Sequence, residues 1–236
     1  MKHVVKVMGL ALLMSGLCGM ANAQFRQSVY LNLNVPTGGF ASSLNTSSVV
    51  PPLGLENIGK EASIGFGAGY RASYRFDVGV GMVAPFAQAD LFWNSIDGDL
   101  RDRYANLHGS APTYFNVPIL VGVSYLYDEL WNDITPYGEF GLGTDLLRIT
   151  SESVKPTTGK IDQRSYKMST SFAWMLGVGA YFGRHVSAGL YYYGLGKHYI
   201  DYTSKYQNQQ TAYEAQTGER ANRTVGSFTL RLGFHF

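Results

Sequence analysis

Histidines are the side chains of this chain with the greatest capacity for acid–base chemistry. Beyond the first 23 residues they are His108, His185, His198 and His235. A serine hydrolase needs a histidine within hydrogen-bond reach of a serine and a carboxylate. Only His198 has both residue types close behind it in the chain, Asp201 and Ser204, and spacing alone does not show that the three side chains meet. We therefore expect an interfacial or loop histidine and no catalytic residue.

A cluster of acidic residues, Asp97, Asp99 and Asp102, is the one candidate for cation binding. It lacks the glycine and the terminal glutamate of a calcium-binding EF-hand loop, and Arg101 and Arg103 interrupt it. We expect a solvated loop here. Neither a phosphate-binding loop nor a metal-ligand spacing is found in the sequence, so we expect no metal and no cofactor.

Several charged residues occur at alternate positions within otherwise apolar stretches. Such charges can line a conduit or pair with one another across a closed interior. An eight-stranded barrel leaves little free lumen, so we expect a sealed network of ion pairs, in which Arg231 pairs with Glu139 or Asp145. The residues of this expected lumen network are Arg71, Arg75, Glu139, Asp145 and Arg231.

The last stretch of the chain, residues 225–236, shows which elements position these charges. Phe228, Leu230, Leu232, Phe234 and Phe236 alternate with polar or small residues. A period of two predicts a β-strand with one apolar face. Because the other face carries Arg231, the strand presents lipid or a core on one side and the charge network on the other.

Seven further stretches show the same alternation, and long and short connections follow them in turn. Their ranges are 28–35, 62–76, 78–93, 114–127, 137–149, about 166–182 and 186–200. Long polar loops follow the first, third, fifth and seventh strands, and no helix longer than two turns is required. The faces of residues 84–93 stay open. Val80, Met82, Ala84 and Phe86 suit the apolar face, which would also place Gln88 and Asp90 there unless a bulge near Pro85 intervenes.

The N-terminus has the features of a secretory signal peptide over residues 1–23. Lys2 and Lys6 precede an apolar run, and Ala21-Asn22-Ala23 is a small-x-small cleavage site. Cleavage leaves residues 24–236 as one barrel domain without cysteine, since Cys18 is the only one. It also removes two of the 19 basic residues, which leaves as many as the 17 acidic ones. This balance argues against a nucleic-acid partner.

These features predict an all-β fold, an eight-stranded antiparallel up-and-down transmembrane β-barrel. An even strand number, alternating faces, interfacial aromatics and alternating loop lengths are typical of outer-membrane barrels. The alternative is a water-soluble barrel of lipocalin type with its apolar face inside, which the same alternation fits. Aromatic residues near the strand ends favour the membrane: Tyr74, Phe76, Tyr125, Tyr127 and Phe236.

The chain resembles small eight-stranded outer-membrane barrels of the OmpA/OmpX-like group, and more closely the outer-membrane-protein β-barrel domain family that includes PorT-like proteins. The similar segments are Tyr114 to Leu120, Pro136-Tyr137 with Gly141 and Gly143, Tyr191 to Leu195 and Leu232 to Phe236. The resemblance covers the whole mature chain. It implies residence in the outer membrane of the Gram-negative cell envelope, with Phe236 as the mark read by the barrel-insertion machinery.

Three functions remain open from the sequence. The first is a non-enzymatic barrel with a structural or surface-interaction role, whose long loops bind an extracellular ligand or an envelope protein. The second is a narrow, porin-like pore for small solutes or a secretion-accessory barrel. The third is a lipid A-modifying enzyme.

Overall fold

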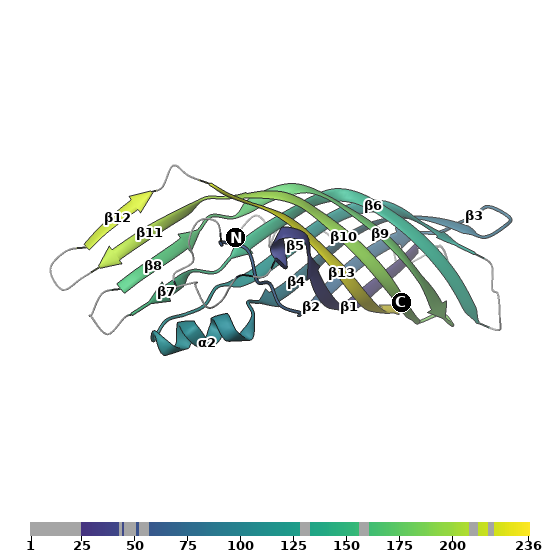
Figure 1. Ribbon diagram of the computed structural model, residues 1–236. Coiled ribbons are helices and arrows are strands. Elements are labelled where there is room, and N and C mark those ends of the chain that lie inside the picture. The colour runs from purple at the N-terminus through teal and green to yellow at the C-terminus, as the bar shows by residue number, and fades with distance from the viewer. Residues whose placement is uncertain are drawn as a thin grey trace.

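The computed structural model describes residues 25–42, 44, 51, 57–127, 133–155, 161–207, 212–216 and 220–236. The expected signal peptide, residues 1–23, lies outside the described residues. The fold is almost entirely β-structure arranged as one long, tilted barrel with an extension at one end (Figure 1).

Eight strands form a closed antiparallel barrel, as the alternation predicted. Each strand pairs with the next along the chain, and β1 pairs with β13 to close the sheet. The barrel strands are β1 (Phe25–Thr37), β2 (Gly65–Tyr74), β4 (Met82–Ser95), β5 (Thr113–Leu126), β6 (Ile134–Ile149), β9 (Ser169–Phe182), β10 (Val186–Ile200) and β13 (Ala221–His235). Closure leaves no unpaired edge in the barrel wall, which is the condition for crossing a bilayer with strands.

The short connections lie together at the end of the barrel where β13 finishes (Figure 1). The predicted start of the third barrel strand was wrong, because β4 begins at Met82 and not near Val78. The two-residue strand β3 (Phe76–Asp77) pairs with the start of β4, and the Val78 amide donates to the Gly81 carbonyl. Gly79 and Gly81 both have positive φ, which is why the turn occurs here. Val80 therefore lies in a turn.

The face assignment is confirmed for the closing strand, whose even-numbered side chains are exposed outside. Apolar residues also face outward in β1, β2, β5, β6 and β9, at odd-numbered positions in β1 and β5 and at even-numbered positions in β2, β6 and β9. The structure decides the faces of β4, which the sequence left open. Ala84, Phe86, Gln88 and Asp90 are all buried inside, and the register with β2 and β5 runs without a bulge at Pro85.

One bulge does occur, in β10. Gly194 pairs with Gly226 and Gly196 with Val225, so Leu195 is the extra residue. Gly196 has φ +78°, a conformation that favours glycine. Before the bulge the odd-numbered residues Tyr191 and Tyr193 are buried inside, whereas after it the even-numbered His198 and Ile200 are buried. The bulge thus turns His198 into the lumen.

The long connections are more structured than the sequence indicated. They build a second, four-stranded sheet in the order β12-β11-β8-β7, which extends the barrel at the end opposite the short turns (Figure 1). Its strands are β7 (Glu152–Val154), β8 (Ile161–Tyr166), β11 (Tyr202–Gln207) and β12 (Ala212–Gln216). A 3-10 turn, η1 (Gly38–Phe40), and the helix α2 (Gly98–Asn106) lie at the same end. We call this whole region the cap.

The helix α2 exceeds two turns and corrects the expected solvated loop. The Asp97 side chain accepts a hydrogen bond from the Asp99 amide as N-cap, and Leu100 and Tyr104 are buried one turn apart. Asp97 is thus the N-cap of a helix. In the described part of the chain, no helix is both long enough and apolar enough to cross a membrane.

Candidate functional site in the polar lumen

The lumen is filled by polar side chains at several levels, and its centre holds the ion pair Arg71–Glu139. Arg71 projects from β2 and Glu139 from β6, and Arg71 Nη1 donates to Glu139 Oε2 at 2.6 Å. The Ser124 hydroxyl donates to the same carboxylate at 2.8 Å. Both charged side chains are buried, so this pair bridges the barrel across its interior.

Arg231 forms a second ion pair beside the first, with Asp90 of β4. Its Nη2 lies 3.1 Å from Asp90 Oδ1 and 3.2 Å from Oδ2, and Nε donates to Asn32 Oδ1 at 3.1 Å. Glu139 Oε1 lies 3.9 Å from Arg231 Nη1, which joins the two pairs. The guanidinium also lies 4.3 Å from the ring centres of Tyr30 and Tyr191. Arg231 is 0 % exposed.

The structure therefore brings together three of the five residues expected in the network: Arg71, Glu139 and Arg231. Asp90 is the addition, and it is the nearest carboxylate to Arg231 where Glu139 or Asp145 was expected. Sequence reasoning missed it because the face of β4 was undecided. Arg75 lies near the short turns, with its guanidinium 4.8 Å from the Tyr181 ring centre.

Asp145 belongs to a different cluster, with His198 and Ser169. His198 Nε2 lies 3.1 Å from Asp145 Oδ2 and 3.0 Å from the Leu195 carbonyl oxygen, and Nδ1 lies 3.3 Å from Ser169 Oγ. Asp145 and His198 are 0 % exposed and Ser169 is buried. The residues named with His198 from the sequence, Asp201 and Ser204, are not its partners here. Asp201 instead pairs with Arg220 at 2.7 Å.

The cap continues the polar filling beyond the barrel wall. Glu152 of β7 is buried and accepts hydrogen bonds from the Tyr104 hydroxyl of α2 and the Tyr166 hydroxyl of β8. Burial raises the pKa of Tyr166, and the nearby Glu152 charge raises it further, so this tyrosine stays protonated and donates. Glu152 thereby holds the helix and the second sheet together.

The other end of the lumen is closed by His235. Its two ring nitrogens lie 2.6 Å from Ser28 Oγ and 2.7 Å from Ser187 Oγ. His185 Nδ1 lies 3.0 Å from the His235 carbonyl oxygen, and His108 is exposed after α2. Among the described residues, no group of three or more His, Cys, Asp or Glu side chains is placed to hold a metal. This arrangement can seal a lumen, and its charges are paired at the centre.

The similarities of this chain to known proteins are to solved structures, at low sequence identity. No family model matches the chain, and no curated protein matches it. It is similar to the solved structure of Neisserial surface protein A, at 12% identity over 89% of this chain and 95% of that one, with a TM-score of 0.42. A major outer membrane protein from Thermus thermophilus aligns at 13% identity over 90% and 99%, with a TM-score of 0.46. The outer membrane enzyme PagL aligns at 12% identity over 87% and 97%, with a TM-score of 0.39.

Proposed function

We propose that this protein is an integral outer-membrane β-barrel with a sealed lumen and no catalytic activity, whose cap binds a partner outside the cell. The observation that carries the proposal is the pair of buried ion pairs, Arg71–Glu139 and Arg231–Asp90, across the centre of the barrel. Charged side chains buried in this way are retained only when paired. Paired, they fill the space through which a solute would pass.

Outer-membrane residence is supported by the outer face of the barrel. Its side chains are large and apolar and remain exposed, as for Leu190 at 64 % and Val121 at 63 %. Apolar surface on this scale is costly in water and favourable in lipid. Outer-membrane lipid and the barrel-insertion machinery are therefore proposed partners, with Phe236 as the insertion mark.

A surface role is supported by the cap, which has regular secondary structure, a four-stranded sheet and a helix. Beside α2 it contains a recess of about 300 Å³, lined in part by Arg101, Tyr104, Gly109 and Ser110. A recess with a cation and backbone polar groups can accept a polar ligand. The cap is therefore where an extracellular ligand or envelope protein would bind.

Conductance in planar bilayers tests the sealed lumen against the porin-like and secretion-accessory alternatives. We expect no steady unitary current from the refolded chain. The variant with Arg71→Ala and Glu139→Ala together is the control, because it widens the lumen without leaving a lone charge, and it should leak ions. Steady unitary currents from the unaltered protein would contradict the proposal.

A hydrolase is the second candidate, because Ser169, His198 and Asp145 are the residue types of a catalytic triad. Three features favour an architectural role. All three side chains are buried, they face the lumen, and His198 presents Nδ1 to the serine and Nε2 to the carboxylate, the reverse of the usual triad. A fluorophosphonate probe distinguishes the two roles. We expect no labelling. Labelling that is lost in both Ser169→Ala and His198→Gln would establish the enzyme.

A further inference from the structure

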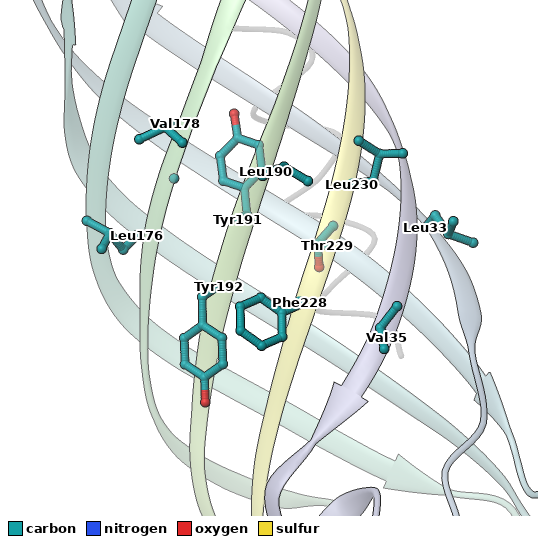
Figure 2. A pocket seen from close by; sticks show the side chains of 11 residues that line it. Leu33, Val35, Leu176, Val178, Leu190, Tyr191, Tyr192, Phe228, Thr229 and Leu230 are labelled. Atoms are coloured by element: carbon teal, nitrogen blue, oxygen red, sulfur yellow. The ribbon is translucent and has the colours of Figure 1, made fainter.

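A trough crosses the outer wall of the barrel over β9, β10, β13 and β1. Figure 2 shows two rows of side chains with the trough between them. Each row contains one residue from each of the four strands, and neighbours within a row are paired across the sheet. One row is Val178, Leu190, Leu230 and Leu33, and the other is Leu176, Tyr192, Phe228 and Val35. The floor includes Gly177, Tyr191 and Thr229, whose side chains or hydrogen turn inward, and the volume is about 390 Å³.

Exposed cations lie beyond the trough toward the cap. Lys197 follows the bulge in β10, Arg148 ends the outward face of β6, and Lys167 lies two residues before β9. All three are exposed. In the part of the chain that the structure describes, no carboxylate lies within ion-pair distance of any of them, and the nearby Asp201 is held by Arg220. Three cations without carboxylate partners give this part of the rim a net positive charge.

Among the described residues, the outward face of β2 and β4 differs from this basic rim. At the same level, the outward side chains on β2 and β4 and just before β2 are apolar, namely Ile64, Phe66 and Trp93. Tyr199 and Phe172 stand among the cations and are exposed, and Lys197 Nζ lies 5.6 Å from the Tyr199 ring centre. Aromatic and basic side chains together mark the level of lipid headgroups. The basic rim and the apolar trough share strand β10, which carries Lys197 above Tyr192 and Leu190.

We propose that this side of the barrel binds a bisphosphorylated, multiply acylated glycolipid of the outer leaflet, with acyl chains in the trough and phosphates on Arg148 and Lys197. The proposal rests on the proposed outer-membrane location. Five residues separate Tyr192 from Lys197, which is about 15 Å of strand, so chains and phosphates fall at different depths. β9 lies between Arg148 and Lys197, and the register places Arg148 three to four residues nearer the cap. The backbone positions of the two cations therefore stand about 15 Å apart and face two phosphates.

Native mass spectrometry of the refolded full chain in detergent tests the proposal, with the fraction of protein retaining lipid as the readout. The probes are bisphosphorylated lipid A, the same lipid without its phosphates, and phosphatidylglycerol. Two variants address the site: Arg148→Gln with Lys197→Gln removes the charge, and Leu190→Trp fills the trough. The matched controls are Arg184→Gln in the short turn after β9 and Val121→Trp on the outer wall of β5, both exposed positions away from the site.

We expect retention of lipid A to fall roughly ten- to thirtyfold when both cations are removed and to fall in Leu190→Trp, with both controls unchanged. The dephosphorylated lipid should be retained no better by the protein than by the charge variant. Equal retention by all variants would overturn the site. Equal retention of phosphatidylglycerol would overturn the glycolipid as its occupant. Every sample is first checked for heat-modifiable gel mobility, and its absence from the unaltered chain would instead refute the membrane barrel itself.

Discussion

Among single residues, Asp90 has the largest expected effect on the lumen, because its carboxylate neutralises the fully buried guanidinium of Arg231. The alternation rule failed in β4 because this lumen is not uniformly polar. Phe86 lies inside with its ring centre 3.9 Å from the Arg71 guanidinium, so an apolar side chain serves as a cation partner there. Hydrophobicity alone therefore did not identify the inner face of β4, and Asp90 was not predicted to lie in the lumen.

Asp90→Asn should destabilise the barrel by about 3 kcal/mol, since it leaves the Arg231 charge buried and largely unpaired. Urea unfolding in lipid vesicles, followed by tryptophan fluorescence and gel mobility, measures the change. Asp102→Asn on the exposed face of α2 is the control and should shift stability by less than about 0.5 kcal/mol. Replacing both Asp90 and Arg231 by leucine and methionine should recover part of the loss. An Asp90→Asn protein as stable as the control would show that the ion pair is not what fills the lumen.

The elements of the barrel were largely readable from the sequence, and those of the cap were not. Strands that cross lipid are recognisable by an apolar outer face. In contrast, β8 and β11 belong to the second sheet outside the barrel wall and consist mostly of polar residues and tyrosine. Two signals were present and unused. Asp97 followed by Leu100 and Tyr104 is a helix start with an apolar face. Gly194 and Gly196 within one strand mark a bulge, and that bulge decides where His198 points.

Gly196→Ala tests whether the β10 bulge is required. A Cβ there would lie 2.2 Å from Ser171 Oγ and 2.3 Å from the Phe172 carbonyl oxygen, at a φ of +78°. We expect a loss of about 1–3 kcal/mol in the free energy of unfolding, with the His198 resonance shifted in an NMR spectrum. Gly98→Ala, where a Cβ meets nothing within 4 Å, is the matched control. A protein unchanged in both stability and His198 environment would refute the role given to the bulge.

Glu152→Ala tests the connection between the helix and the second sheet. Two tyrosine hydroxyls would lose a buried acceptor, so the cap should open more often and trypsin should cleave after Arg164 roughly tenfold faster. The barrel itself should keep its heat-modifiable mobility, because the ion pairs in the lumen are untouched. Asp102→Ala serves as the exposed control. Unchanged cleavage would mean that the cap is held together without Glu152.

At the scale of the whole molecule, one rule organises the chain: apolar residues outside, paired polar residues inside. It follows from the period of two along each strand, and it leaves a cap of mixed polarity at one end (Figure 1). The proposed partner of that cap could not be read from the sequence, because ligand recognition would depend on how polar loops pack, and polar loops carry no periodic pattern.

The orientation of the wall is the central claim, and spin labels measure it most directly. A chain that has lost residues 1–23 contains no cysteine, so single cysteines can carry a nitroxide at Val121, Leu190 and Leu230 in turn, with Asp102 as the exposed cap position. In lipid vesicles, collisions with oxygen should dominate at the three wall positions and collisions with a water-soluble nickel chelate at Asp102. Nickel collisions dominating on the wall, or immobile labels buried away from both reagents, would contradict a barrel whose apolar face meets lipid.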